Sequence, residues 1–151
     1  MLPSQIQREI LIDAPVEVVW RIITEPDQIV RWFSQEADLD PRAGGRGRLG
    51  FPSGLRVQLR IESVEPPRRF AFRWAQEKAP AARMDDAPLV EFTLHPEEGG
   101  TRLLVVETGY DRVDWSDEDK EKYVEEHTEG WRECLERLAE YAARAQGVGG
   151  Q

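Results

Sequence analysis

The feature that most constrains this chain is one long amphipathic stretch near its C-terminal end. From residue 117 to residue 145, apolar side chains recur at helical spacing and occupy an arc of about 120°. Ser116 is placed to cap such a helix, and the acidic residues of the first turn suit the positive end of its dipole. A helix of this length spans about 43 Å, so it needs a broad apolar surface to cover its inner face. That face consists of Tyr123, Val124, His127, Trp131, Cys134, Leu135, Leu138, Tyr141 and Ala142.

The preceding sequence supplies this surface as short alternating runs, which are typical of antiparallel strands. A first run at 5–12 is followed by two short helices, one starting at Pro15 and one covering 27–33. Ala, Pro and charged residues at 77–88 predict a long, mobile hairpin loop. The later strands are expected at 36–40, 46–51, 55–64, 69–76, 89–95 and 101–111.

Alternation also predicts which side chains of each strand face the helix. Arg56, Gln58, Arg60 and Glu62 form the wet face of the clearest strand. At Leu103–Val106 the apolar run is continuous, so periodicity does not select a face. The inner set elsewhere is Leu55, Val57, Leu59, Ile61, Phe70, Phe72, Trp74, Val90, Phe92 and Leu94.

The order of strand, two short helices, several strands and long helix predicts an α+β fold. A length of 151 residues suits one domain, expected at 1–146, followed by a flexible Gly-rich tail at 147–151. Hydrophobic residues make up 40% of the chain, which excludes a disordered protein. A long helix over one face of a twisted sheet can leave a hollow between the two layers.

Charge and composition exclude several classes of partner and site. The chain has 29 acidic and 20 basic residues, a net charge of -9, which argues against nucleic acid and anionic membranes as partners. Because no apolar run is long enough to span a bilayer or form a signal peptide, we expect no membrane insertion and a cytoplasmic location. Cys134 is the only cysteine and there are two His, so we expect no metal site and no cofactor. Cys134 itself is interpreted as a small core residue.

Short segments spread over residues of about 6 to 142 carry a family resemblance. They are Ile10–Pro15 with Val19-Trp20, Trp32-Phe33, Gly44-Gly45, Val64–Pro66, Gly100–Leu103 running to Glu107–Tyr110, and His127 with Gly130-Trp131 and Leu138. In this order they resemble the activator of Hsp-90 ATPase homologue-like family of the START-like (SRPBCC, Bet v 1-like) superfamily. The resemblance implies a helix-grip fold, in which a curved antiparallel sheet wraps around the C-terminal helix, two short helices close one end, and a cavity lies inside.

The resemblance also implies an inward position for Glu107, on the strand face that carries Leu103 and Val105. There it could meet His127, whose imidazole would oppose the rise that burial causes in the pKa of a carboxyl group. Two interpretations stay open: a structural pair that sets the register of helix and sheet, or a polar anchor for a ligand. In relatives the entrance lies near the positions of Trp32 and Trp115, which makes these two residues candidate gates.

A glycine-rich segment at 44–48 has a superficial likeness to a phosphate loop. It lacks the Walker lysine pattern and a following helix, so we interpret it as a turn into a strand. Arg42, Arg46 and Arg48 could still contact an anionic partner.

The sequence thus favours non-enzymatic binding of a small hydrophobic or amphipathic ligand, such as a lipid, polyketide or aromatic metabolite, by a monomer or weak homodimer. One alternative is a co-chaperone-like protein whose partner is an Hsp-90-type ATPase. Another is a cyclase-like or hydrolytic enzyme that uses Glu107 and His127. The expected ligand contacts are Leu59, Ile61, Phe72, Trp74, Phe92, Leu103, Val105, Glu107, Tyr123, His127 and Trp131.

Overall fold

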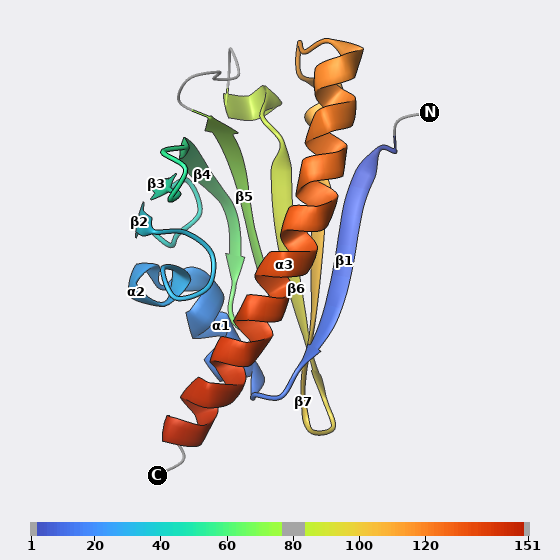
Figure 1. The fold of residues 1–151 in the computed structure, drawn as a ribbon. Helices are drawn as coiled ribbons and strands as arrows, with labels where there is room; N and C mark the ends of the chain where they lie inside the picture. The colour runs from blue at the N-terminus through green and yellow to red at the C-terminus, as the bar shows by residue number, and fades with distance from the viewer. Residues whose placement is uncertain (1–2, 77–83, 150–151) are drawn as a thin grey trace.

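In the described residues of the computed structural model, 3–76 and 84–149, seven strands form one antiparallel sheet in the order β1-β7-β6-β5-β4-β3-β2. One long helix, α3, lies across a face of this sheet (Figure 1). The predicted α+β helix-grip fold is confirmed. The elements are β1 (Gln5–Ile12), α1 (Val16–Thr24), α2 (Pro26–Ile29), β2 (Glu36–Leu39), β3 (Arg46–Gly50), β4 (Arg56–Glu65), β5 (Arg69–Gln76), η1 (Met84–Asp86), β6 (Leu89–Glu97), β7 (Gly100–Thr108), η2 (Tyr110–Arg112) and α3 (Asp117–Gly149).

The first two helices follow β1 directly, as predicted, but the second is shorter than expected. Pro15 precedes the first residue of α1, where the fixed φ of proline suits entry into a helix. Helix α2 ends at Ile29 rather than at residue 33, and the chain continues in tight turns. The indole N–H of Trp32 donates to the carbonyl of Ile22 at 3.0 Å, which fixes this turn against α1.

The inner faces of the strands agree with the alternation except at one end of β4. Val57, Leu59 and Ile61 are buried, whereas Leu55 precedes the strand and is 37% exposed, so it lies at the edge of the inner face and is not part of the core. The reason is local, because the Leu55 carbonyl accepts from the N–H of Phe51 at 2.9 Å and closes a turn. Segment 44–48 is a turn into β3, as predicted, and Gly44 supplies its positive φ of 82°.

Strand β7 points Leu103, Val105 and Glu107 into the core, the face that the resemblance implied. The strand stops at Thr108, earlier than predicted, because Gly109 adopts a left-handed φ of 87° and the short helix η2 begins. This turn redirects the chain from the sheet toward the start of α3.

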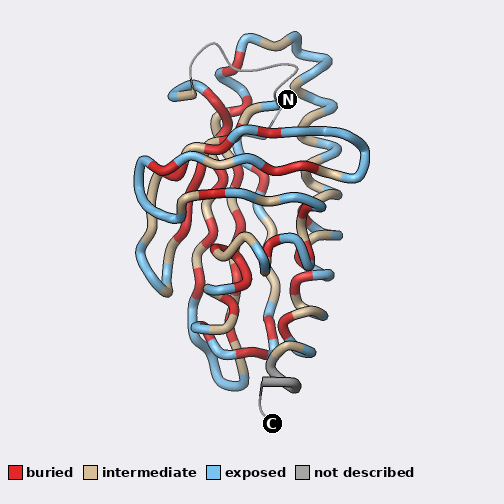
Figure 2. The backbone as a smooth tube through the Cα atoms, turned by 90° about the vertical axis from the view of Figure 1, so that its left-hand side faces the viewer, coloured by how far each residue is buried: buried red, intermediate tan, exposed pale blue. Residues whose placement is uncertain are grey.

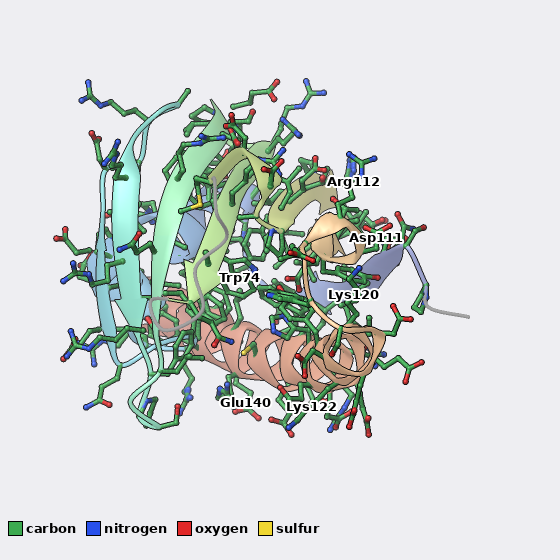
Figure 3. The ribbon with its side chains drawn as sticks, turned by 90° about the horizontal axis from the view of Figure 1, so that it is seen from above. Trp74, Asp111, Arg112, Lys120, Lys122 and Glu140 are labelled. Atoms are coloured by element: carbon green, nitrogen blue, oxygen red, sulfur yellow. The ribbon has the colours of Figure 1, made fainter. Side chains whose placement is uncertain are left out.

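Helix α3 packs one side on the sheet and leaves the other in water, as Figure 2 shows by burial. Its N-terminus is capped as predicted, since the backbone N–H of Asp119 donates to Ser116 Oγ at 3.1 Å. Figure 3 shows Trp74 between the sheet and α3, with Lys122 and Glu140 on the outer side of the helix. The helix continues past Ala145, its expected end, to Gly149.

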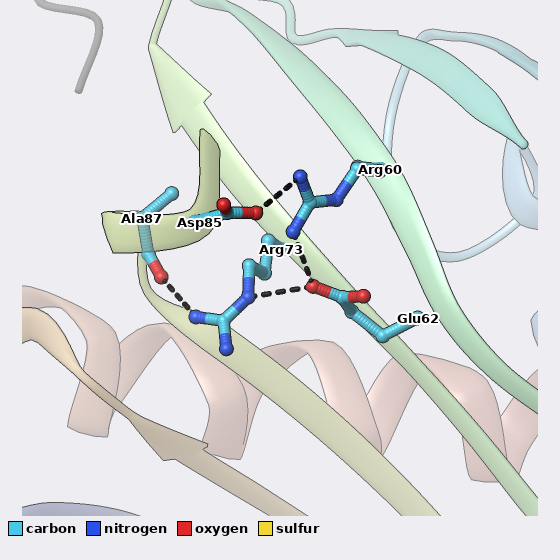
Figure 4. A network of polar contacts seen from close by, with 5 residues as sticks. All are labelled: Arg60, Glu62, Arg73, Asp85 and Ala87. Carbon is cyan, nitrogen blue, oxygen red and sulfur yellow. Dashed lines mark hydrogen bonds and ion pairs between the residues drawn. The ribbon is translucent and has the colours of Figure 1, made fainter. Parts of the chain in front are cut away.

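On the outer face of the sheet, an ionic network holds the segment before β6 (Figure 4). Arg60 Nη1 contacts Asp85 Oδ1 at 2.6 Å, and Arg73 Nη1 donates to the Ala87 carbonyl at 2.8 Å. Glu62 Oε1 joins both arginines, at 2.8 Å from Arg60 Nη2 and 2.6 Å from Arg73 Nε. The network therefore fixes η1 against β4 and β5. Residues 77–83 of the predicted loop lie outside the described residues.

The deep interior near α1 and α2 is filled by side chains. The void found there has a volume of about 10 Å³, which is about one water molecule at most. Leu59, Phe72 and Phe92 border it, together with aliphatic residues of the first two helices and β2 and β3. Any enclosed ligand must therefore lie elsewhere. Within the described residues, no helix combines the length and the apolar character needed to cross a membrane.

Candidate functional site

A fully buried carboxylate at the junction of sheet and helix holds four other side chains together. Glu107 is 0% exposed. Its Oε1 accepts from Trp131 Nε1 at 2.9 Å and lies 2.9 Å from His127 Nδ1. Its Oε2 accepts from Trp74 Nε1 at 3.0 Å and from the hydroxyl of Tyr123. We call these five residues the Glu107 cluster.

Three elements position the cluster. Glu107 lies on the inner face of β7, and Trp74 lies on the inner face of β5. Tyr123, His127 and Trp131 are spaced four residues apart on α3, so they form one row on the helix surface. The rings of Tyr123 and His127 stack with centroids 3.7 Å apart, and Trp74 meets His127 edge-on at 5.6 Å. Ring packing therefore helps to hold the donors of these side chains in place around the carboxylate.

The cluster keeps its carboxyl group ionised. Burial by itself would raise the pKa of Glu107, but hydrogen bonding and charge from His127, with the Tyr123 and Trp131 donors, lower it below the usual glutamate value. Burial raises the pKa of Tyr123 well above its usual value, and the neighbouring Glu107 charge adds to this shift. A carboxylate only accepts hydrogen bonds, so His127 Nδ1 carries a hydrogen and donates it to Glu107.

A pocket of about 260 Å³ adjoins the cluster. Trp74, Tyr123, His127 and Trp131 belong to both the cluster and the pocket wall, whereas Glu107 is hidden behind them. Leu55, Gln76 and Glu126 are the exposed residues of the lining and mark its rim. The described lining, which we call the aromatic pocket, is Phe33, Phe51, Leu55, Val57, Trp74, Ala75, Gln76, Pro88, Trp115, Tyr123, Glu126, His127, Gly130, Trp131 and Cys134.

Stacked rings form much of the pocket wall. Phe33 lies nearly parallel to Trp131 and Trp74, with ring centroids 5.4 Å and 6.0 Å apart. Trp74 and Trp131 also stack on each other at 5.7 Å. At the other end, Trp115 lies 5.1 Å from Tyr123 at a tilt of 40°. Such rings give a ligand large apolar contact at a low cost in side-chain entropy.

The structure divides the sequence-predicted ligand contacts into three groups. Trp74, Tyr123, His127 and Trp131 line the aromatic pocket, and Glu107 bonds to all four of them. The other predicted contacts are buried but are not in the pocket lining: Leu59, Phe72 and Phe92 border the small void, while Ile61, Leu103 and Val105 pack in the core. The structure therefore gathers about half of the predicted set at one place.

Of the two candidate gates, only Trp115 lines the pocket. Trp32 is buried in the core against α1. Cys134, interpreted as core, is half-buried in the pocket wall, and burial raises the pKa of its thiol. Its sulfur accepts from Arg137 Nη2 at 3.3 Å.

Sequence reasoning missed other lining residues. Helical periodicity could have found Glu126 and Gly130, which precede Trp131 and Cys134 at spacings of four or five residues and border the predicted stripe. Nothing in the pattern indicated Phe33 or Phe51, because both lie in turns where periodicity carries no information.

The arginines near the glycine turn do not contribute to this pocket. Arg42 pairs with Asp40 at 2.6 Å, and Arg46 and Arg48 line a separate polar groove on β2, β3 and β4. Glu36 and Asp38 lie in the same groove, so its charge is mixed. Among residues 3–76 and 84–149, no group of three His, Cys, Asp or Glu side chains is placed to hold a metal ion.

Comparison with known families and structures agrees with this fold. The family described as Activator of Hsp90 ATPase homolog 1-like protein matches residues 13–143. The crystal structure of protein MLL2253 from Mesorhizobium loti has a TM-score of 0.77 and 25% identity, over 93% of this chain and 97% of that one. CalU16 from Micromonospora echinospora has a TM-score of 0.70 and 30% identity, over 95% of this chain and 79% of that one.

A third solved structure shares the fold alone. DynU16, a protein in the dynemicin biosynthetic locus, has a TM-score of 0.76 and 24% identity. The match covers 92% of this chain and 47% of DynU16. The comparison with curated proteins gave no match.

Proposed function

Because the chain belongs to the Activator of Hsp90 ATPase homolog 1-like family, we propose that it binds a small hydrophobic or amphipathic molecule in the aromatic pocket without changing it chemically. The observation that carries the proposal is the pocket itself, a space of about 260 Å³ between sheet and helix. Ligand sites are mostly apolar with a few convergent polar groups, and this lining has that composition.

The Glu107 cluster supports binding by keeping the pocket open. A hydrogen bond from each of Trp74, Trp131, Tyr123 and His127 to one buried carboxylate fixes the rings around the space instead of letting them collapse into it. A preformed wall of this kind lowers the ordering cost of binding. The charge of Glu107 thus has a structural role in this proposal. His127 is the cluster member that also offers a ligand a polar atom, its second ring nitrogen.

The volume limits the ligand. Typical sites for drug-sized molecules have volumes of about 300–1,000 Å³, so this pocket suits one or two rings, or the end of a longer molecule that enters past the rim. The locus of DynU16 shows that this fold occurs in the setting of small-molecule biosynthesis. An aromatic metabolite or a polyketide is therefore a suitable ligand class for the first screen.

The test is direct because Trp74, Trp115 and Trp131 lie in the pocket wall and report on it by fluorescence. The protein is titrated with lipids, polyketides and aromatic metabolites while its emission and melting temperature are followed. Gly130→Leu fills the pocket, since the space around the Gly130 Cβ position is open, and should weaken binding at least tenfold. Glu133→Leu adds the same side chain at an exposed position of α3 outside the lining and should leave binding unchanged. Equal binding by both variants would place the ligand elsewhere.

A second candidate is general acid–base catalysis, which the geometry of His127 favours. Its Nδ1 is held by Glu107, and the residue is part of the pocket lining, so Nε2 is the ring nitrogen available to a bound substrate. His127→Gln should then abolish turnover of any substrate found while leaving its binding within about threefold. Binding without turnover in the wild-type protein would support the first proposal instead.

The family description supplies the remaining candidate, a co-chaperone-like role at an Hsp90-type ATPase. Such a role would act through the protein surface. Stimulation of the partner's ATP hydrolysis should then survive Gly130→Leu, whereas ligand binding should not.

A further inference from the structure

The polar groups of the aromatic pocket are distributed unevenly, and this distribution indicates the charge of its ligand. An indole has one N–H donor, and both Trp74 and Trp131 donate it to Glu107. Tyr123 also donates its hydroxyl hydrogen to Glu107. These three residues therefore turn their donors away from the pocket and leave it their aromatic rings, whose faces are electron-rich.

The groups that remain for a ligand are few. Among the described lining residues they are the Gln76 amide, the Glu126 carboxylate, the second ring nitrogen of His127 and the thiol of Cys134. None of the described lining residues is Lys or Arg. Arg137, which contacts the Cys134 sulfur, also donates to the Trp32 carbonyl at 3.2 Å and is not part of the lining.

Among the described residues of the site, the charges sum to a negative value in either state of His127. Glu107 and Glu126 each contribute one negative charge, and His127 contributes at most one positive charge. A cation at the rim would be attracted both by the Glu126 carboxylate and by the aromatic ring faces, whereas an anion would be repelled by both. The whole chain, with a net charge of -9, adds to this field.

We infer that the aromatic pocket selects a cationic amphiphile: a body of one or two rings bearing an amine or ammonium group directed toward Glu126. The inference rests on the proposed function and specifies the ligand class of the same site. It assigns to Glu126 the role of a specificity-determining residue at the rim.

Three probes with one two-ring body separate charge from apolar contact. They are naphthalen-2-ylmethanamine, which is an ammonium ion at pH 7.5, the neutral naphthalen-2-ylmethanol, and the 2-naphthoate anion. Binding is measured by isothermal titration calorimetry at low ionic strength, because salt would screen the rim charge. The expected order of affinity is ammonium, then alcohol, then carboxylate, with at least about a tenfold span between the first and the last.

Two variants test Glu126 itself. Glu126→Gln should weaken binding of the ammonium probe about two- to fivefold, the range for an exposed ion pair, and leave the alcohol probe unchanged. Glu125→Gln removes the same charge from the neighbouring exposed residue, which does not line the pocket, and should change neither. Equal losses in both variants would overturn the role of Glu126.

The outcomes separate the inference from the proposed function. If no probe binds at millimolar concentration, the proposed function fails and the inference fails with it. If the three probes bind equally, or the carboxylate binds best, the pocket is a binding site but the inferred charge preference is wrong.

Discussion

Replacing Glu107 by Gln is the sharpest test of the cluster, because it keeps the size of the side chain and replaces the carboxylate by a neutral amide. The carboxylate accepts from four donors, two at each oxygen. An amide offers one acceptor and one donor, so its NH₂ must face either Trp131 and His127 or Trp74 and Tyr123. A hydroxyl or an imidazole can exchange its role to accept, but an indole N–H cannot.

The magnitude follows from this count. If the amide NH₂ faces Trp131 and His127, the Trp131 N–H loses its acceptor; if it faces Trp74 and Tyr123, the Trp74 N–H keeps the Tyr123 oxygen at 3.2 Å, but the Tyr123 hydroxyl hydrogen loses its acceptor. Leaving one buried donor unsatisfied costs about 1–3 kcal/mol. We therefore expect Glu107→Gln to lower the free energy of unfolding by about 2 kcal/mol at pH 7. Glu107→Leu leaves all four donors without this acceptor and should cost at least about twice as much.

The assay is urea denaturation followed by circular dichroism and Trp fluorescence, with the slope of the transition checked for a two-state process. Glu9→Gln is the matched control, because Glu9 is an exposed carboxylate on β1 paired with Arg102 at 2.8 Å, and should change stability by less than about 0.5 kcal/mol. A Glu107→Gln protein as stable as wild type at pH 7 would refute an ionised Glu107 held by four donors.

The pH dependence gives a second reading of the same variant. The pKa of Glu107 is lower in the folded protein than its usual value of 4.5, so its ionisation stabilises the fold above that pH. This stability is lost as the pH falls through the folded pKa. The difference between wild type and Glu107→Gln should therefore narrow below about pH 4.5.

Three further predictions concern the surroundings of the pocket. Gly130→Ala should raise the free energy of unfolding by up to about 1 kcal/mol and raise the melting temperature accordingly, because the added Cβ meets no atom within 4 Å and Ala is favoured over Gly within a helix. A lower melting temperature would contradict this. Tyr110→Phe removes a 2.6 Å hydrogen bond to the Pro3 carbonyl and should cost about 1 kcal/mol in urea denaturation at pH 7. Since burial raises the pKa of Tyr110 to about 12, from 10.0, only wild type should lose the stability contributed by this group as the pH rises through that window. Glu62→Gln should cost about 0.5–1 kcal/mol at pH 7 and less at pH 3: burial alone would raise the pKa of Glu62, but bonds from Arg60 and Arg73 lower it below 4.5, so its contribution declines in acid, and an equal cost at both pH values would contradict the ion pairing.

Local patterns in the sequence determined the elements and their faces. Alternation selected Val57, Leu59 and Ile61 as inward residues, and helical spacing placed Tyr123, His127 and Trp131 in one row, both as the structure has them. These predictions succeed because the repeat of a strand or helix is fixed by its own backbone. Where a turn begins, the repeat ends, and Leu55 is for that reason more exposed than the alternation predicted.

The family resemblance added what periodicity left open, the inward face of β7 and hence the meeting of Glu107 with His127. It could not say which aromatic residues enclose a space. Phe92 and Trp74 have the same inward pattern, yet Phe92 fills the core while Trp74 lines the pocket.

Tertiary structure alone decided that difference. The described pocket wall combines side chains from strands β4 and β5, helix α3 and several connecting segments, and whether a space remains depends on how closely these distant segments approach. A repeat along one segment reports the direction of a side chain but not its distance from segments remote in sequence. The sequence by itself therefore determined a sheet with an aromatic inner face and a long helix with an acidic outer face. Packing between the sheet and the helix decided where a pocket remains between them.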